Sequence, residues 1–590
     1  MGSSDLLDIT RSLSGRRWVW RAAEDRVGLG IAQRLGLPEI LGRLLAARGV
    51  GAEAAADFLD PTLRALLPDP SVLADMDLAA ARLADAVGRG ETVGVFGDYD
   101  VDGACSGAVI ASFLRGLGCP TLAHVPDRLA EGYGPNLPAL QNLIARGATL
   151  IVCVDCGTAA GHILAEVQPV ADVLVLDHHK SDGVPPAVAA TVNPNRLDCR
   201  SGLGHLCAAA IAFLTVVATV RVLRRAGFFA ARPEPDLLAL LDLVALATVC
   251  DVMPLTGLNR ALVAQGLKVM ARRGRPGIAA LLDVALVRDK PSAMTLGFAL
   301  GPRINAAGRI SEADLGLRLL LCEDPVEARG LAATLDAVNR QRQQVELSML
   351  EAAMQAAEAQ ASGGHPVVLV AGHEWHPGVV GIVAGRIKER FNRPACVLAV
   401  ADGVAKGSGR SVPGLDLGAA VIAARQAGIL NTGGGHAMAA GFSLPEARLA
   451  DFHAFLAERL AAAADLPSVA DLSVEGTVAV AGCSMDLAMQ IARLAPFGPG
   501  NEEPVLILPR ARVVRADRVG REANTIRAFV EGEGGMGRLK AMLFRAKDGP
   551  LADALLARGG ASLHLAGHLR AEEWNGTTTP GFVVADAAAV

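Results

Sequence analysis

The chain has 590 residues, of which 51% are apolar and 20% are charged, and its net charge at pH 7 is −5. This length predicts roughly three or four domains, and the apolar fraction excludes disorder as the main state. An acidic net charge gives no global indication of nucleic-acid binding, so a basic face would have to be local.

Targeting and membrane segments are not expected. The first 20 residues contain Arg and Asp but no continuous apolar run, which argues against a signal peptide. The most apolar run, Leu206 to Val220, ends at Arg221 and is shorter than the roughly 20 residues that span a bilayer. We interpret it as a buried helix. Ten cysteines without framework spacing predict reduced thiols and a cytoplasmic protein, and the single CxxC at Cys153 and Cys156 is a weak zinc motif.

The segment 1–90 is predicted to be a helical N-terminal cap, because leucines such as Leu41, Leu44 and Leu45 recur at helical spacing. Short apolar strands then alternate with helices, which predicts a parallel sheet covered by helices. The strand candidates are Thr92 to Phe96, Leu122 to Val125, Thr149 to Val154 and Val173 to Leu176.

Acidic residues and histidines follow these strands, at the sheet edge where ligands bind in such folds. Three alternating acids follow the first strand, Asp155 follows the third, and Asp177, His178 and His179 follow the fourth. Asp251 follows the later apolar stretch Leu237 to Val249. The acids after the first strand are Asp98, Asp100 and Asp102.

Carboxylates this close repel one another unless a cation lies between them, so the pattern predicts a divalent-metal site. The carboxylate-rich ligand set suits Mg²⁺ or Mn²⁺ better than zinc, and two such ions would serve phosphoester hydrolysis. Taken singly, the acidic run is compatible with a solvated turn, Asp251 with a helix end, and the histidines with core packing.

A long helix is predicted from Asp324, which is an N-cap followed by Pro325 and by Glu327 in a capping box. Its apolar periodicity continues to Ser362, about 54 Å at 1.5 Å per residue, which is typical of an interdomain strut. The polar run Asn339 to Gln344 is expected to be solvated, although Arg340 or Arg342 could face a nucleic-acid groove.

A second alternating region follows, with strands expected at Val367 to Val370 and Ala395 to Ala399. It is glycine-rich at 373–381, 407–411 and 433–441. Backbone N–H groups of glycines can approach an anion, and Arg303 and Arg410 can donate bidentate bonds to phosphate, so these segments suggest a phosphate track. Beyond about Pro467, short strands and turns suggest a small barrel. Ile507 to Lys547 contains ten Arg or Lys against four Asp or Glu, a local basic patch.

Four motifs in the first half resemble motifs one to four of the DHH phosphoesterases. They are Asp-Tyr-Asp-Val-Asp-Gly from Asp98, Val-Asp-Cys-Gly around Asp155, Leu-Asp-His-His-Lys around His178 and Cys-Asp-Val-Met-Pro around Asp251. The resemblance implies that metal ligands match Asp100, Asp102, Asp155, His178 and Asp251, with Asp98 and His179 nearby. It also implies that Asp177 orients a histidine.

The second half narrows the resemblance to the RecJ single-strand-specific exonucleases with their DHH-associated domain. The motifs begin at Gly301, His376, Gly407 and Gly433, the first reading Gly-Pro-Arg-Ile-Asn-Ala-Ala-Gly-Arg. By this resemblance Ser408 and Arg410, together with Arg128, hold the 5′ end of the strand. His179 and His436 are the expected catalytic histidines, the latter beside the scissile phosphate. The further expected phosphate-binding residues are Arg303, Asn305, Gly434 and Gly435.

The implied fold is α/β: a parallel-sheet DHH domain joined by a long helix to a second α/β DHH-associated domain, followed by an OB-type β-barrel. The expected boundaries are 1–90 for the cap, 91–323 for the DHH domain with its catalytic metals, 324–362 for the connecting helix, 363–464 for the DHH-associated domain and 465–590 for the OB-type nucleic-acid-binding domain. The barrel has no sharp motif, so its assignment depends on order and basicity.

The implied activity is 5′ to 3′ hydrolysis of single-stranded DNA to mononucleotides with Mn²⁺ or Mg²⁺, in repair and recombination. The implied partners are a single-strand-binding protein and a RecQ-type helicase, and the implied state is a monomer without membrane association. One alternative is a small-substrate DHH phosphoesterase acting on oligoribonucleotides or cyclic dinucleotides. Another is a non-catalytic replication scaffold.

Four aromatic residues in these motifs stay open. Tyr99 alternates with the acids and is expected to point away from them. Tyr133 and Trp375 are compatible with base stacking or with loop packing. His205 stands where the RecJ pattern has a small residue, and we interpret it as a core histidine.

Overall fold

The computed structural model describes residues 7–21, 23–128, 131–180, 183–467, 469–557, 560, 562–574 and 576–590. The chain divides into two compact units. Unit 1 comprises Met1–Gly49, Arg340–Ala492 and Pro504–Val590, and unit 2 comprises Val50–Asn339 and Arg493–Glu503. The expected cap over 1–90 is therefore split, with its first part in unit 1 and the rest in unit 2.

Unit 2 is built on a five-stranded, fully parallel sheet. The four predicted strands are present, and the structure adds a fifth, the short β6. In spatial order the strands are β3 (Thr121–His124), β2 (Val93–Gly97), β4 (Leu150–Val154), β5 (Asp172–Leu176) and β6 (Ala190–Val192). β2, β4 and most of β5 are buried on both faces, which explains why they are continuous apolar runs.

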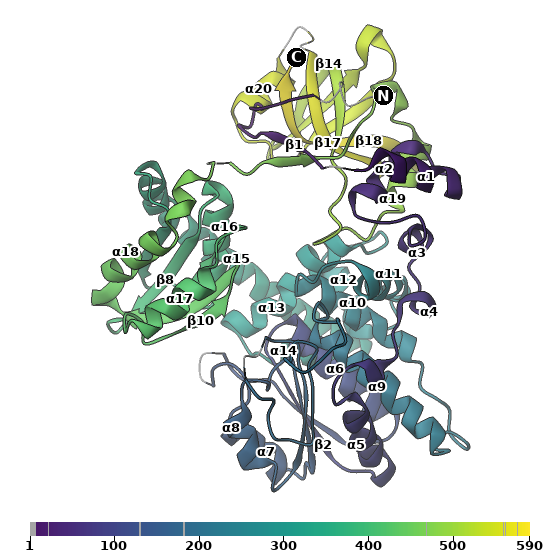
Figure 1. Ribbon diagram of the computed structural model, residues 1–590, viewed down its shortest axis with the longest axis vertical. Helices are drawn as coiled ribbons and strands as arrows, with labels where there is room; N and C mark the ends of the chain where they lie inside the picture. Colours follow the sequence, from purple (N-terminus) through teal and green to yellow (C-terminus); the bar gives the residue numbers. More distant parts are fainter. Residues whose placement is uncertain are drawn as a thin grey trace. The chain divides into compact units, whose positions relative to one another are not determined.

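Helices cover both faces of this sheet (Figure 1). One face carries α7 (Leu137–Ala145) and α8 (Gly161–Val167), and the other carries α5 (Met76–Arg89), α6 (Val101–Gly116) and α9 (Ala208–Arg225). α9 contains the apolar run expected to be a buried helix. None of the helices in the described ranges combines the length and hydropathy needed to cross a membrane.

Most of the rest of unit 2 is helical. Its helices include α3 (Ala55–Leu59), α4 (Leu63–Leu66), α10 (Leu241–Cys250), α11 (Gly257–Met270), α12 (Pro276–Val284), a π-helical turn (Thr295–Leu300), α13 (Gly301–Ile310) and α14 (Leu315–Leu321). Short 3₁₀ turns occur at Pro70–Val72 and Leu237–Leu240.

The strand order places the carboxyl ends of β2 and β4 at a topological switch point. β2 lies between β3 and β4, so the chain leaves β2 toward one edge of the sheet and returns on its other side. Crevices at such points are the usual ligand sites of open parallel sheets. The loops that open onto this crevice begin at Asp98 and Asp155.

The first acidic motif differs from the expected continuation of the strand. β2 ends at Gly97, and α6 begins at Val101, with Asp100 as its N-cap. Asp102 therefore lies in the first turn of a helix. The expectation that Tyr99 points away by strand alternation does not apply, because no strand continues through it.

The predicted long helix is present as α15 (Pro325–Ser362), and the boundary between the two units falls inside it, between Asn339 and Arg340. Unit 1 contains a five-stranded sheet in the order β10 (Thr432–His436), β11 (Ala439–Pro445), β9 (Val404–Arg410), β8 (Ala395–Ala401) and β7 (Val368–His373). Its helices are α16 (Val380–Phe391), α17 (Leu417–Gln426) and α18 (Leu449–Arg459).

Two glycine-rich stretches that the sequence did not predict as strands form β9 and the hairpin of β10 and β11. Side chains leave little room there: a Cβ on Gly407 would lie 2.5 Å from the Phe442 ring, and one on Gly409 would lie 2.6 Å from Leu417. Glycine is used here for close packing, which strand propensity alone does not reveal.

The C-terminal part of unit 1 is the predicted barrel, closed by pairing of β14 with β17. Its strands are β14 (Leu506–Val519), β15 (Thr525–Glu531), β16 (Arg538–Leu543), β18 (Thr577–Ala589) and β17 (Ser562–Trp574), with β13 (Gly476–Thr477) added beside β14. α19 (Met485–Ala492) and α20 (Pro550–Leu556) accompany it.

The N-terminal residues pack with this barrel. β1 (Trp18–Trp20) pairs in parallel with β12 (Leu472–Val474), and the Trp18 indole donates to Asp586 Oδ2 at 3.0 Å. Two helices, α1 (Asp25–Leu35) and α2 (Glu39–Ala47), follow in unit 1. Sequence periodicity predicted the helices but not their partner.

Candidate metal centre

The loop after β2 presents two carboxylates whose positions are fixed by the backbone. Asp100 Oδ1 accepts hydrogen bonds from the amides of Asp102 at 2.9 Å and Gly103 at 3.1 Å, which caps α6. Asp98 Oδ1 accepts from the Tyr99 amide at 2.7 Å. Gly103 is required here, because a Cβ would lie 2.4 Å from the Asp98 carbonyl oxygen.

Asp102 joins α6 to the start of α9. Its Oδ2 accepts from the Ala208 amide at 2.7 Å, and its Oδ1 accepts from the Ala209 amide at 2.8 Å. These are free amides of a helix N-terminus, where the helix dipole favours an anion. Asp102 is 1% exposed, so its ionised form depends on these partners and on any bound cation.

Asp155 follows β4 in an unusual backbone conformation. Its φ is +59°, a left-handed value that costs a non-glycine residue on the order of 1 kcal/mol or more. The Asp155 amide donates to the Leu176 carbonyl at 3.0 Å, which aligns the loops after β4 and β5. Local strain of this kind is common where a side chain has to be aimed at a site.

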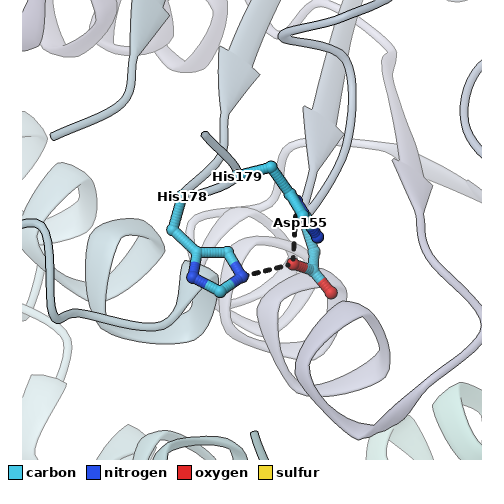
Figure 2. A group of neighbouring side chains, drawn as sticks. All are labelled: Asp155, His178 and His179. Carbon is cyan, nitrogen blue, oxygen red and sulfur yellow. Dashed lines mark ion pairs between the residues drawn. The ribbon is translucent and has the colours of Figure 1, made fainter. Parts of the chain in front are cut away.

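Both histidines of the loop after β5 face Asp155 (Figure 2). His178 Nε2 lies 3.2 Å from Asp155 Oδ1, and His179 Nδ1 lies 3.9 Å from the same oxygen. His178 Nε2 is also 3.6 Å from Asp251 Oδ2 and 3.8 Å from Asp102 Oδ2. The His178 imidazole therefore lies among carboxylates from three separate segments.

Ligand atoms of seven side chains gather into three overlapping groups, each with its atoms within 4.8 Å of one another. Asp155 and His178 belong to two groups each. The groups are Asp155, His178 and His179; Asp102, His178 and Asp251; and Asp98, Asp100 and Asp155. The structure thus brings together every residue that the sequence proposed as a metal ligand.

The electrostatics of this cluster favour a bound cation. Burial, followed by repulsion from Asp100, raises the pKa of Asp98 to about 8. Burial and the neighbouring acids Asp102 and Asp100 raise the pKa of Asp251 to about 9. The pKa of Asp155 is raised well above its usual value for the same two reasons. A divalent ion would remove this cost by compensating the charges.

The donor set fits such an ion. Asp251 Oδ2 is buried and accepts no hydrogen bond from the described residues, which leaves a lone pair aimed into the cluster. Carboxylate oxygens with one or two imidazoles are ligands suited to Mn²⁺ and Mg²⁺. Asp251 is the C-cap of α10, and the next residue, Val252, has a φ of +59°, so this loop is strained too.

Asp177 orients the histidine loop, as predicted. Its Oδ1 lies 2.7 Å from His179 Nδ1 and accepts from the amides of His178 and His179. Although burial alone would raise it, the pKa of Asp177 is lowered by the His179 bond. Although burial alone would lower it, the pKa of His179 is raised to about 9 by Asp177.

Two asparagines hold the same loop and were not singled out from the sequence. Asn193 Nδ2 donates to the His179 carbonyl at 2.9 Å, and Asn195 Nδ2 donates to the His178 carbonyl at 2.6 Å. They stand in an Asn-Pro-Asn run directly after β6. The sequence did not indicate them because β6 was not predicted, and β6 is the strand that brings this run to the carboxyl edge of the sheet.

Arg128 and the two tyrosines lie at the margin of the cluster. The Arg128 guanidinium is 5.3 Å from the centroid of the Tyr99 ring, and Tyr99 meets Tyr133 edge-on at 6.4 Å. The Tyr133 hydroxyl is 3.2 Å from His179 Nε2, and the Tyr133 side chain is 55% exposed. Tyr133 is thus a neighbour of the site rather than a core residue.

α13 contributes contacts different from those expected. The Asn305 side-chain carbonyl accepts from the Val101 amide at 3.2 Å, so it fixes the loop that carries Asp100. The Arg303 guanidinium donates to Asp336 Oδ1 at 3.0 Å and to the Ala299 carbonyl at 2.6 Å. Phosphate binding by these two residues stays a prediction.

The expected phosphate-binding residues of unit 1 gather on one sheet. In the register of β10, β11 and β9, Gly434 and Ser408 both lie opposite Gly441, and His436 and Arg410 both lie opposite Ala439. Arg410 Nη1 donates to Ser408 Oγ at 2.8 Å. Gly435 has a φ of +153°, and a Cβ there would lie 2.4 Å from the Ala439 carbonyl.

Three family models match the chain in this order: the DHH family N-terminal domain over residues 92–248, the DHHA1 domain over 363–462 and the RecJ OB domain over 474–586. Curated proteins named single-stranded-DNA-specific exonuclease RecJ are similar over most of their length. The protein from Dickeya dadantii is 39% identical, covering 86% of this chain and 89% of that protein. The one from Escherichia coli is 40% identical, covering 80% and 83%.

The chain belongs to the RecJ family. A crystal structure of RecJ from Thermus thermophilus in complex with Mn²⁺ is similar with a TM-score of 0.79 and 30% identity, covering 97% of this chain and 79% of that one. The Mg²⁺ complex of the same protein gives a TM-score of 0.74 at 29% identity. The fold class expected from the sequence is confirmed.

The remaining open residues of this RecJ-family chain have structural contacts. Trp375 packs on Gly372, where a Cβ would lie 2.3 Å from the indole ring, so loop packing accounts for it. His205 is half-buried, and burial lowers its pKa. Cys153 and Cys156 are both buried free thiols.

Proposed function

We propose that the protein is a metal-dependent exonuclease that hydrolyses single-stranded DNA from the 5′ end to mononucleotides. The observation that carries the proposal is the set of overlapping ligand groups sharing Asp155 and His178 at the switch point of the sheet. Similarity to RecJ proteins named for this activity, and to RecJ bound to Mn²⁺ and Mg²⁺, supports it.

We assign the ligands of the divalent ions to Asp98, Asp100, Asp102, Asp155, His178 and Asp251. When bound, such ions supply Lewis acidity for phosphodiester hydrolysis. His179 is next to these carboxylates, and Asp177 fixes its ring. A histidine held in this way can hold or move a proton at Nε2 while Nδ1 stays bonded to Asp177.

Substrate binding is assigned to residues of unit 1 and to three residues of unit 2. Ser408, Arg410 and Arg128 would hold the 5′ phosphate, because a guanidinium beside a hydroxyl forms several charged hydrogen bonds to phosphate oxygens. His436, Gly434 and Gly435 would face the scissile phosphate. Arg303 and Asn305 are proposed to contact phosphate as well, in addition to their observed internal bonds.

The domain roles follow the same proposal. The DHH domain (91–323) would hold the metals, the DHH-associated domain (363–464) the phosphate track, and the barrel (465–590) further nucleotides through its arginines. Repair and recombination would be the cellular setting, with a single-strand-binding protein and a RecQ-type helicase as partners. A cytoplasmic location is proposed because such pathways act on chromosomal DNA, and a monomer is proposed because the family resemblance implies one.

The direct test is digestion of a long single-stranded oligonucleotide labelled at either the 5′ or the 3′ end, with Mn²⁺. Release of a labelled mononucleotide from the 5′-labelled strand at the earliest times, with slow loss from the 3′-labelled strand, is expected. A duplex of the same sequence should resist digestion. Activity confined to dinucleotides would instead support the small-substrate alternative.

A further inference from the structure

The segment Arg493–Glu503, here called the strap, belongs to unit 2 although the elements on both sides of it, α19 and β14, belong to unit 1. A chain segment that leaves its neighbours to pack elsewhere has to be held by specific contacts. Those contacts centre on one arginine, one asparagine and the loop that carries Asp251.

Arg260 on α11 holds the strap. It is only 1% exposed and is the largest fully buried side chain of the described residues. Its guanidinium donates to the Ala495 carbonyl at 2.7 Å and to the Pro496 carbonyl at 3.3 Å. The same group donates to the Phe58 carbonyl at 2.8 Å and stacks over the Phe58 ring at 3.9 Å. A buried charge is expensive unless it is fully used, so this arrangement indicates a fixed position for the strap.

Asn501 closes the strap on itself. Its side chain is completely buried, and its Nδ2 donates to the carbonyls of Leu494 and Pro496, each at 2.8 Å. The backbones of Gly498 and Asn501 exchange two further hydrogen bonds at 3.0 Å. The strap is therefore a closed turn, and the Asn501 side chain bonds its two ends together.

The strap contacts the loop Asp251–Leu255 directly. The Leu255 amide donates to the Pro499 carbonyl at 2.7 Å. The Leu255 side chain packs on Gly498 so closely that a Cβ there would lie 2.8 Å from Leu255 Cδ1. Gly500 has a φ of +72°, and a Cβ there would lie 3.2 Å from Pro254 Cβ. The glycines of the strap are thus needed for this contact.

The same loop is tied from a second direction by Asn259. This fully buried residue donates through Nδ2 to the Pro254 carbonyl at 3.1 Å and to the His205 carbonyl at 2.7 Å. His205 precedes the N-terminus of α9, whose amides hold Asp102. Asn259 therefore ties the loop that begins at Asp251 to the segment before α9, whose amides hold Asp102. The strap holds the same Asp251 loop from its other side.

We propose that the strap is a positioning element of the metal centre, which fixes Asp251 and thereby sets the affinity for the divalent ion. The inference rests on the proposed function. Groups that orient metal ligands typically change metal affinity 10–100-fold when removed. Only Pro504 and Val505 separate the strap from β14, so the residues that hold Asp251 continue directly into the barrel.

The test uses the full chain with Asn501→Ala, which removes the side-chain bonds from Asn501 to the carbonyls of Leu494 and Pro496. The Mn²⁺ concentration for half-maximal hydrolysis of single-stranded DNA should rise about tenfold, with the maximal rate regained at saturating Mn²⁺. Gln360→Ala is the matched control, because Gln360 bonds the Leu369 backbone at 2.7 and 2.9 Å in unit 1. It should leave the Mn²⁺ requirement unchanged.

Hydrogen exchange over residues 251–256 gives a readout that needs no activity. Uptake should increase in Asn501→Ala and not in Gln360→Ala. Gly500→Ala, which strains the strap without removing a bond, is the second variant if Asn501→Ala does not fold. An unchanged Mn²⁺ requirement and unchanged exchange in a folded variant would overturn the inference. If the wild type itself neither binds Mn²⁺ nor cleaves DNA, the proposed function fails, and exchange still decides whether the strap holds the loop.

Discussion

The metal centre of unit 2 and the glycine-rich sheet of unit 1 place polar groups by different means. Around the metal centre, carboxylates are buried and fixed by backbone amides, as Asp102 is by Ala208 and Ala209. On the glycine-rich sheet, strand register alone aligns Ser408 with Gly434 and Arg410 with His436. Repulsion between the buried carboxylates of the metal centre is unfavourable, and a bound cation relieves it. The glycine-rich sheet leaves backbone N–H groups accessible to an anion.

The difference separates the two expected kinds of mutational effect. Loss of a buried metal ligand should lower kcat for hydrolysis. Loss of a residue on the glycine-rich sheet should raise KM for the DNA strand and leave kcat largely unchanged. A variant that changes kcat therefore belongs to the metal centre, and a variant that changes KM belongs to the glycine-rich sheet.

Asp155→Ala should reduce kcat on the order of 10³-fold or more, because Asp155 belongs to two of the ligand groups. Single-turnover release of mononucleotide from 5′-labelled single-stranded DNA measures this. Gln168→Ala is the control. Gln168 bonds Asp172 and Val173 at the start of β5, whereas the histidine loop follows the other end of that strand. Retained kcat in Asp155→Ala, with contaminating nucleases excluded, would refute the metal assignment.

Arg410→Ala should raise KM for 5′-phosphorylated single strands about 10–100-fold, with a smaller change in kcat, because a charged hydrogen bond contributes about 1.5–3 kcal/mol. Arg410→Lys should recover only part of the loss, since lysine keeps the charge but not the fork of donors. Comparison of strands with a 5′ phosphate and a 5′ hydroxyl measures the effect. Equal discrimination in wild type and Arg410→Ala would show that Arg410 does not read the phosphate.

The metal centre was more predictable from the sequence than the open sheet, for a physical reason. Acids at strand ends are costly without a cation, so Asp98 and Asp155 stand out in a single chain, whereas Asp251 at the end of α10 gains its meaning only beside them. The strands β9 and β10 contain glycines that strand propensity disfavours, and in β9 the close packing of Phe442 on Gly407 and of Leu417 on Gly409 explains them. Glycine chemistry suggested a phosphate track there, but the choice of Ser408 and Arg410 for the 5′ end came from family resemblance alone.

The residues that hold the candidate ligands in place could be predicted from the sequence only in part. Asp177 stands beside the histidines and was assigned correctly. Asn193 and Asn259 act through the backbone carbonyls of His179 and His205, which lie 14 and 54 residues away in the sequence, and such contacts have no local signal in the sequence. The same holds for the N-terminal strand β1, whose partner β12 lies in a distant part of the chain.

Asp177→Asn should weaken the apparent affinity for Mn²⁺ about 10–100-fold, because an amide oxygen accepts more weakly than a carboxylate from the backbone amides of His178 and His179 and so holds the loop of the ligand His178 less firmly. Activity measured against Mn²⁺ concentration tests this, and the maximal rate should recover at saturating metal if the role is orientation. A loss of maximal rate that no Mn²⁺ concentration restores would indicate that the exchange disables His179 itself.

Mn²⁺ should raise the unfolding temperature of metal-depleted protein by about 5 °C at a concentration 100 times its Kd, since binding then contributes about 2.7 kcal/mol. Differential scanning calorimetry after chelation measures the shift. Asp155→Asn should abolish it, because the neutral amide removes the carboxylate shared by two ligand groups. Arg410→Ala should keep the full shift, because its sheet holds no candidate ligand group among the described residues. A shift lost equally in both variants would mean that the two regions respond to the ion as one, and the contrast between a buried cation site and an open anion site would not hold.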